Sequence, residues 1–274
     1  MNQPQPGPTS NPAQTYEEYF VPYQFRPWTE ELLERAKPQP GERVLDLACG
    51  TGIVARMVAQ RMNGQAQLAG LDLSPAMLEV ARSAARREGA QVAWHEGSAA
   101  ALPFPDGSYD LVLVQQGLQF FPDKAAAAGE MYRVLDVGGR AATSTWTEIA
   151  NNPFFEVFAG VIQKHLGTPA LHTPFSLGDQ ATLRPLFVNA GFDDVKIERV
   201  GRTVRFPSPD RFVDLGLAGA SAAVPALQTM DAAERAALTE AVRVDMEVPL
   251  RQYTDDDELV FLLETHIVLA RKAG

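Results

Sequence analysis

Apolar and polar positions alternate in blocks along the middle of the chain, and the blocks predict strands and helices in turn. Short apolar runs predict strands at 43–47, 67–72, 91–95, 110–115 and 140–146. Between them, apolar residues at helical spacing predict helices at 53–62, 75–88 and 124–135. Pro75 suits the first turn of a helix, and Gly138-Gly139 reads as the turn that closes the third helix. Strands that alternate with helices of this length predict a parallel sheet with right-handed crossovers.

Beyond residue 146 the rhythm loosens. Helices are predicted at 151–166 and 179–190, and strands at 195–200 and 260–270. An insertion as long as 205–257 with helical stretches of its own indicates a cap over the sheet edge. The predicted organisation is a proline-rich disordered tail (1–14), an aromatic and helical lid (15–39), a core (40–150), and the rest of the sheet with helical caps at about 151–178 and 205–257 (151–274).

Composition narrows the class of protein. The 274 residues are 46% hydrophobic, enough for a full core, and carry a formal net charge of −10. Such an acidic chain lacks the general attraction to phosphate backbones, so no nucleic-acid partner is expected. Cys49 is the only cysteine, which rules out an intramolecular disulfide or a multi-cysteine metal site. No apolar run approaches the length of a membrane span, and no signal peptide is recognised, so a cytoplasmic protein is expected.

The run from Val44 to Ala55 is the most informative part of the chain. An apolar strand ends at Asp46-Leu47, and a turn with two glycines, Gly50 and Gly52, leads into a helix. Glycines let the backbone approach a ligand closely, and the helix that follows presents free N–H groups. With Asp72 about 20 residues on, the run fits the dinucleotide fingerprint. The carboxylate of Asp46, however, would suit a ligand that carries an ammonium and a sulfonium.

Three further segments favour the ligand with an ammonium and a sulfonium over a dinucleotide. They are Leu71–Met77, Leu102–Asp110 and Glu130–Gly139. Together with Asp46–Gly52, they resemble the consecutive motifs of the class I S-adenosylmethionine (SAM)-dependent methyltransferases, in order and at the right spacing. The nearest subgroup is similar to the enzymes of ubiquinone and menaquinone biosynthesis. The resemblance covers roughly residues 40–145 and implies a doubly wound, Rossmann-like α/β fold whose seven-stranded sheet has an antiparallel last strand.

The resemblance also implies cofactor contacts for individual residues. Asp46, Ala48 and the Gly50/Gly52 loop would hold the methionine moiety of SAM, and Asp72 would accept hydrogen bonds from both ribose hydroxyls. Leu73 and Met77 would pack on adenine, and Ser98 with the backbone of Ala99 would meet the adenine edge. Gln115 would line the path to the methyl group. Apart from the resemblance, the aromatic residues Tyr16, Tyr19, Phe20, Tyr23 and Phe25 are expected to form a lid over cofactor and acceptor.

Two departures from the family pattern stand in the sequence. Ala48 replaces the first glycine of the acidic-x-G-x-G-x-G motif, and Ser98 stands where many relatives carry an acidic residue. For single residues a plain structural role is the alternative. Asp46 would then only cap the turn, Met77 would be core, and the aromatic residues from Tyr16 to Phe25 would form the packed side of a helix.

The acceptor and the catalytic groups are less sharply indicated. His165, His172 and Tyr19 are weak candidates for a general base, with surface or core roles as the alternative. The segment Gln115-Gln116-Gly117-Leu118 lacks the Asn/Asp-Pro-Pro-aromatic signature of DNA amino-methyltransferases, and no metal site is predicted.

The function indicated is methyl transfer from SAM to an O, N or C nucleophile of a small molecule, with S-adenosylhomocysteine as product. Two alternatives stay open on the sequence. One is a protein of this fold that binds SAM without transferring its methyl group, and the other is an NAD(P)-dependent oxidoreductase that uses the same glycine loop.

Overall fold

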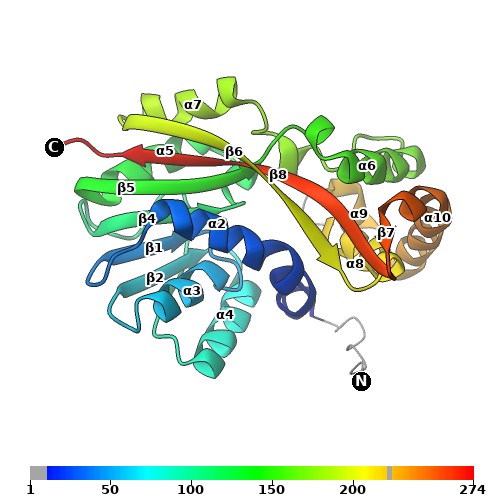
Figure 1. Ribbon diagram of the computed structural model, residues 1–274, viewed down its shortest axis with the longest axis horizontal. Helices are drawn as coiled ribbons and strands as arrows, with labels where there is room; N and C mark the ends of the chain where they lie inside the picture. Colours follow the sequence, from blue (N-terminus) through cyan, green and yellow to red (C-terminus); the bar gives the residue numbers. More distant parts are fainter. Residues whose placement is uncertain (1–10, 221–223) are drawn as a thin grey trace.

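A single mixed β-sheet runs through the molecule in the computed structural model, which describes residues 11–220 and 224–274 (Figure 1). The strand order is β3-β2-β1-β4-β5-β8-β6, and a short β7 pairs only with β8. The strands are β1 (Arg43–Leu47), β2 (Gln67–Asp72), β3 (Ala93–Glu96), β4 (Tyr109–Gln115), β5 (Leu135–Trp146), β6 (Asp193–Phe206), β7 (Thr254–Asp255) and β8 (Glu258–Arg271). The first five are parallel, whereas β8 is antiparallel to both β5 and β6. The predicted doubly wound sheet with an antiparallel last strand is confirmed.

Helices cover both faces of the sheet, and a third group lies beyond its end (Figure 1). The helices before β5 are α1 (Pro12–Thr15), α2 (Arg26–Ala36), α3 (Ile53–Arg61), α4 (Pro75–Glu88) and α5 (Lys124–Val134). Those after it are α6 (Pro153–Leu166), α7 (Gln180–Asn189), α8 (Pro209–Ala220), α9 (Pro225–Thr229) and α10 (Ala232–Leu250). Short 3-10 turns are η2 (Leu118–Phe120), η3 (Ile149–Asn151), η4 (Thr173–Phe175) and η5 (Arg251–Tyr253).

The tightly capped helix α4 has the bounds that its sequence predicts. The Ser74 hydroxyl accepts from the Met77 amide at its start, Pro75 occupies the first turn, and Gly89 ends it in a left-handed conformation. By contrast, Gly138-Gly139 does not form the predicted turn before the fifth strand, because β5 already begins at Leu135 and runs through both glycines.

The last strands are longer than predicted and connect the sheet to the cap. Strand β6 extends for 14 residues, well past the predicted 195–200, whereas β8 exceeds the predicted 260–270 by two residues at its start and one at its end. Their far halves carry Phe206 and Phe261 into an apolar cluster with α6, α8 and α10. The cap and the sheet therefore share strands, as Figure 1 shows on its right-hand side.

The N-terminal segment has a winding that the sequence does not predict. Residues Tyr16–Phe25 form a π-helical stretch, η1, between α1 and α2. Residues 1–10 of the predicted tail lie outside the described residues, whereas Pro12–Thr15 are helical and the Asn11 side chain caps the Ala13 amide.

Candidate functional site

The glycine loop after β1 has the backbone that a close ligand approach requires. Ala48, Gly50 and Gly52 all have positive φ, at 56°, 53° and 82°. A side chain on Gly52 is excluded by space as well, because its Cβ would lie 2.3 Å from Cη2 of Trp94 on β3. The loop thus passes over an indole ring and enters α3 at Ile53. Ala48 adopts the same left-handed region at a steric cost that glycine avoids.

Asp46 lies under this loop as a buried acid. Its side chain is 1% exposed, and Oδ2 accepts a 3.0 Å hydrogen bond from the Ala55 amide in the first turn of α3. The pKa of Asp46 is raised to about 7, mainly by burial and also by the nearby Asp72, while the hydrogen bond from Ala55 and the charge of Arg56 act in the opposite direction. The capping role is therefore real, and a cation placed beside Asp46 would favour its ionised form.

Asp72, at the end of β2, forms hydrogen bonds to both the glycine loop and the turn that precedes α4. Its Oδ2 accepts from the Gly50 amide at 2.8 Å, and its Oδ1 accepts from the Ser74 amide at 2.9 Å. Each carboxylate oxygen can accept a further hydrogen bond, so these contacts orient the group without exhausting it.

The residues predicted to meet adenine lie at the rim. Leu73 is 73% exposed, and Met77 is half-buried and lines a cavity described below. Ser98 is exposed, its hydroxyl accepts from the Ala100 amide, and it forms an isolated bridge with Ala101. The half-buried Ala99 packs against an apolar core cluster that contains Leu71 and Leu102. An exposed leucine between a pocket carboxylate and a capped helix is the kind of surface on which a flat ring can pack. Their role toward a cofactor remains a prediction.

An aromatic cavity of about 270 Å³ opens beside the glycine loop, between the sheet and the cap. The sheet side contributes Met77, Gln116, Phe120 and Trp146, and the cap contributes Phe155, Phe158, Leu171, Pro174, Phe175, Phe212, Gly216 and Gly219. The N-terminal segment adds Tyr16, Phe20, Gln24 and Phe25. Among the described residues that line it, none carries a carboxylate, ammonium, guanidinium or imidazole, and polar groups come from Tyr16, Gln24, Gln116 and the Trp146 indole.

The N-terminal segment lies over the glycine loop and also packs against the cap. A Cβ on Gly50 would lie 4.0 Å from the Tyr16 ring, so this ring covers the glycine loop. Phe20 lines the cavity and also packs edge-on against Phe206 and Phe212. Burial, with help from Asp72, raises the pKa of the Tyr16 phenol, which therefore stays neutral.

Two neighbouring glutamines at the end of β4 have different surroundings. Gln115 donates to the Phe25 carbonyl at 3.0 Å and does not line the cavity, so its predicted place beside the methyl group stays a prediction. Gln116 does line it, with a strained φ of 53°. Its amide nitrogen donates to the Thr265 hydroxyl at 3.0 Å and its oxygen accepts from Gln119 at 3.1 Å.

The three weak candidates for a base lie outside the cavity lining. Nε2 of His165 is 2.7 Å from Asp245 Oδ2, across the contact between α6 and α10. His172 is exposed, although its neighbours Leu171 and Pro174 line the cavity. Tyr19 is buried in the cap cluster, where its ring packs against Phe206 and lies under the Arg211 guanidinium. Sequence reasoning missed Gln116, Trp94 and Trp146. The position of Gln116 and Trp146 at the ends of β4 and β5 was the signal that could have indicated them, and Trp94 inside β3 had none.

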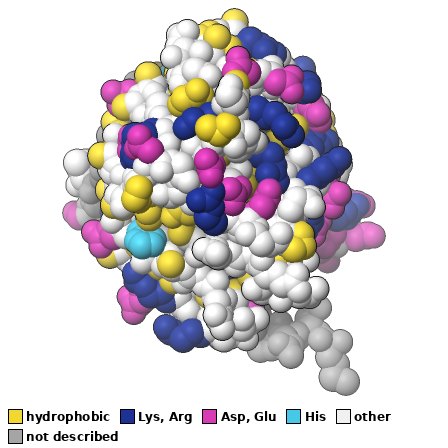
Figure 2. Space-filling model, turned by 90° about the vertical axis from the view of Figure 1, so that its left-hand side faces the viewer, with side chains coloured by type: hydrophobic (Ala, Val, Ile, Leu, Met, Phe, Trp, Pro, Cys, Tyr) yellow, Lys and Arg dark blue, Asp and Glu magenta, His cyan; other side chains and the backbone are white. Residues whose placement is uncertain are grey.

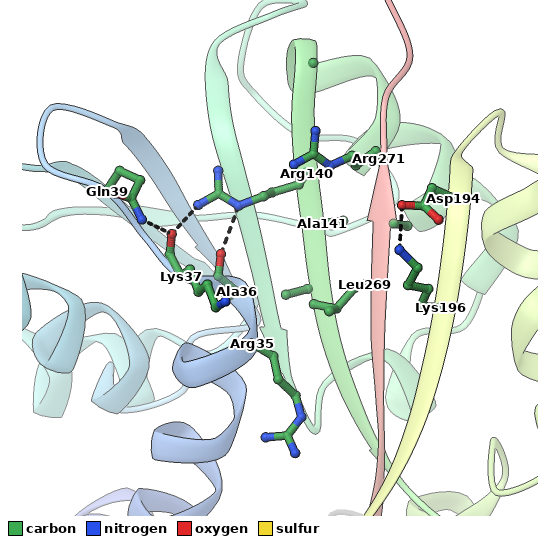
Figure 3. Close-up of a pocket in the computed structure, with 13 residues that line it drawn as sticks. Arg35, Ala36, Lys37, Gln39, Arg140, Ala141, Asp194, Lys196, Leu269 and Arg271 are labelled. Atoms are coloured by element: carbon green, nitrogen blue, oxygen red, sulfur yellow. Dashed lines mark hydrogen bonds and ion pairs between the residues drawn. The ribbon is translucent and has the colours of Figure 1, made fainter.

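A second hollow, of about 370 Å³, lies at the amino ends of the parallel strands (Figure 3). Its cations are largely engaged: Arg140 donates to the Ala36 and Lys37 carbonyls and pairs with Glu42, and Lys196 pairs with Asp194. Figure 2 shows Lys and Arg interleaved with Asp and Glu on this end of the molecule. These contacts fasten the end of α2 to the sheet, far from the glycine loop.

Within the described ranges, no group of three His, Cys, Asp or Glu is placed to hold a metal ion. No helix among the same residues is long and apolar enough to cross a membrane.

Comparison with known proteins points to the same site. Residues 44–139 match the family described as "Methyltransferase domain". The chain is 43% identical over 113 residues to a demethylmenaquinone methyltransferase of Thermus thermophilus, covering 41% of this chain and 51% of that protein. It is 38% identical over 135 residues to a ubiquinone/menaquinone biosynthesis C-methyltransferase, UbiE, of Xanthomonas campestris, covering 48% and 53%. The chain thus spans about half the length of the curated relatives it matches.

The fold extends further than the sequence match. The structure of phosphoethanolamine N-methyltransferase 2 from Haemonchus contortus, in complex with phosphomonomethylethanolamine and S-adenosylhomocysteine, superposes with a TM-score of 0.60. Sequence identity is 20%, and the match covers 96% of this chain and 57% of that chain. The likeness at this identity shows the fold, including the strands beyond residue 139.

Proposed function

We propose that this chain, whose residues 44–139 form a class I SAM-dependent methyltransferase domain, transfers a methyl group to an uncharged ring compound held in the aromatic cavity. The observation that carries the proposal is the juxtaposition of the glycine loop with that cavity. Tyr16 touches both, since it covers Gly50 and lines the cavity wall.

The glycine loop fits the proposed cofactor. The Thr51 hydroxyl in the loop is buried without a hydrogen-bond partner among the described residues, so it could form a hydrogen bond to a ligand. Asp46 is a buried acid whose pKa a ligand ammonium would lower. SAM would supply an electrophilic methyl group on a sulfonium. Asp46 and the loop would hold its amino-acid end, and Asp72 would hold its ribose.

The chain's own contribution to the reaction would be placement and exclusion of water. In-line displacement requires the nucleophile to lie close behind the methyl carbon. Phe20, Phe25 and Tyr16 would close the cavity from the N-terminal side, while Phe155 and Phe212 would close it from the cap. Once water is excluded, the contacts with the cavity walls would fix the orientation of a bound ring.

The cavity chemistry favours an aromatic acceptor with oxygen substituents. Ring-lined walls without charged groups favour a flat apolar molecule, and the carboxamides of Gln24 and Gln116 offer hydrogen bonds to hydroxyl or carbonyl oxygens. The names of the two curated relatives refer to quinone methylation, which supports a quinol-like ring as the acceptor class. An activated ring carbon also needs less help from a base, and the one titratable side chain among the described lining residues is the Tyr16 phenol, whose pKa is raised.

Calorimetry and a labelling assay test the proposal together. S-adenosylhomocysteine and NADH are titrated into the full chain, and methyl-labelled SAM is then incubated with quinols, phenols and amines. We expect S-adenosylhomocysteine to bind, NADH to give no heat, and label to appear in the quinols. Binding of NADH alone would overturn the proposal. Binding of SAM without label transfer to any acceptor would favour the non-methylating alternative.

A further inference from the structure

The guanidinium of Arg56 on α3 is buried at the junction of three parts of the molecule. It is 2% exposed, and its Nε lies 3.3 Å from the Gly52 carbonyl oxygen in the glycine loop. Its Nη2 lies 2.7 and 3.0 Å from the two carboxylate oxygens of Glu17. Its Nη1 donates to Glu88 at the end of α4. One buried cation therefore contacts the glycine loop, the N-terminal segment and a surface helix.

The two carboxylates that pair with Arg56 differ in what they hold. Glu88 is the last residue of α4 and also accepts from Gln60 on α3, so it links two helices of the core. Glu17 belongs to the π-helical segment, directly after Tyr16, which covers Gly50. Its side chain is 10% exposed, so the ion pair is shielded from water and from salt. Of the two carboxylates, Glu17 is the one that belongs to the segment that carries Tyr16.

We propose that Glu17 is a positioning residue, which fastens the segment Tyr16–Phe25 over the cofactor loop through Arg56. The inference rests on the proposed function, because the loop is taken to be the SAM site. Pairing with Glu17 satisfies a buried charge that would otherwise remain only partly compensated, so the closed arrangement is favoured. The same pairing holds Tyr16 against Gly50 and Phe20 in the cavity wall.

This arrangement predicts that the affinity for the cofactor depends on the Glu17–Arg56 ion pair. If only the fastened segment completes the site, the apparent affinity for the cofactor falls with the fraction of molecules in which the segment is closed. Removing the charge at Glu17 should lower that fraction, whereas removing the charge at Glu88 should not. The two substitutions each take one carboxylate from the same guanidinium, and so they form a matched pair.

The test compares Glu17→Gln with Glu88→Gln in the full chain, with Glu18→Gln as the control. Glu18 is the exposed neighbour that binds only Gln14 among the hydrogen bonds of the described residues. We expect Glu17→Gln to weaken S-adenosylhomocysteine binding about tenfold and to raise KM for SAM more than it lowers kcat. Glu88→Gln should keep the affinity within about twofold while lowering the thermal midpoint, because its loss destabilises the α3–α4 contact.

Hydrogen exchange on the ligand-free protein provides a second measurement. Amides in 16–25 should exchange faster in Glu17→Gln than in Glu88→Gln, and Glu17→Asp should lie between Glu17→Gln and the unmodified chain. The inference would be overturned if Glu17→Gln and Glu88→Gln weakened S-adenosylhomocysteine binding equally. It would also be overturned if hydrogen exchange of the amides in 16–25 were unchanged in Glu17→Gln. If the unmodified chain binds no S-adenosylhomocysteine, the proposed function fails, and the exchange experiment still decides whether Glu17 holds the segment.

Discussion

At the scale of single residues, the buried acid Asp46 makes cofactor binding depend on pH. With a folded-state pKa of about 7, raised by burial, roughly nine-tenths of the carboxyl is protonated at pH 6. If Asp46 pairs with the ammonium of the cofactor, binding must remove that proton. We expect close to one proton to be released per SAM bound at pH 6 and almost none at pH 8.5, measured by calorimetry in buffers of different ionisation enthalpy.

The control for this prediction is Asp46→Asn, which should abolish the proton release. Proton release that persists in the variant would assign it to another group. The same shift affects folding. Because the pKa is raised from 3.8 to about 7, the native state binds the proton more tightly than the unfolded chain. This contribution to stability is complete below about pH 4 and is lost as the pH rises to about 7.

Ala48 and Gly117 lie so close together that the effect of substitutions at both positions on the free energy of unfolding can be predicted. A Cβ on Gly117 would lie 2.7 Å from the Cβ of Ala48, so Gly117→Ala should lower the free energy of unfolding by about 1–3 kcal/mol. Ala48→Gly relieves a positive φ, at the cost of a more flexible unfolded chain, and should be nearly neutral. In the double variant the contact is absent and stability should recover. Urea denaturation of the four proteins gives the coupling energy, and additive effects would contradict the prediction.

The residue scale also shows where sequence reasoning reached its limit. Asp46, Asp72 and the two glycines were found because their motif has a fixed spacing, and the structure brings them together around one loop. Gln116 could not be distinguished from Gln115, because the positive φ at Gln116 decides which carboxamide enters the cavity. Arg56 appeared as one residue of an amphipathic helix, and its two carboxylate partners are 39 and 32 residues away in the chain.

At the scale of elements, local signals predicted the helices better than the strands. Ser74 and Gly89 fix the ends of α4, so its bounds follow from neighbouring residues. The outer strand β6 carries charged side chains at many positions, as edge strands often do, and its apolar pattern therefore covers only part of its length. The π-helical winding of Tyr16–Phe25 depends on packing against Phe206 and the glycine loop, contacts that no local pattern encodes.

The contact between α6 and α10 explains His165 without a catalytic role. Asp245 on α10 binds both Lys164 and His165 of α6, which places the imidazole in a partly exposed ion-pair cluster. We expect His165→Gln and His172→Ala to leave kcat and KM within about twofold, because neither side chain lines the cavity. Steady-state assays with the acceptor identified by labelling provide the measurement. A loss of kcat of a hundredfold or more in either variant would restore that histidine as a base.

At the scale of the whole molecule, the matched segment is paired and packed with strands that lie outside it. Strand β5 pairs with β8 from Arg140 opposite Arg271 to Trp146 opposite Thr265. Ile267 and Val268 of β8 are fully buried, one in each of two core clusters that also contain residues of the matched segment. A chain that ends at residue 147 would leave the edge of β5 and both clusters open to water.

We therefore expect a fragment of residues 1–147 to show no cooperative thermal transition, although it contains the whole glycine loop. The full chain should unfold in one transition, because β6 and β8 carry the apolar cluster of the cap into the sheet. S-adenosylhomocysteine should raise the midpoint temperature of that single transition without splitting it, since it would bind only the folded state. Circular dichroism and calorimetry measure both. A fragment that melts cooperatively and binds S-adenosylhomocysteine would show instead that the core is independent, and that the cap contributes only to the choice of acceptor.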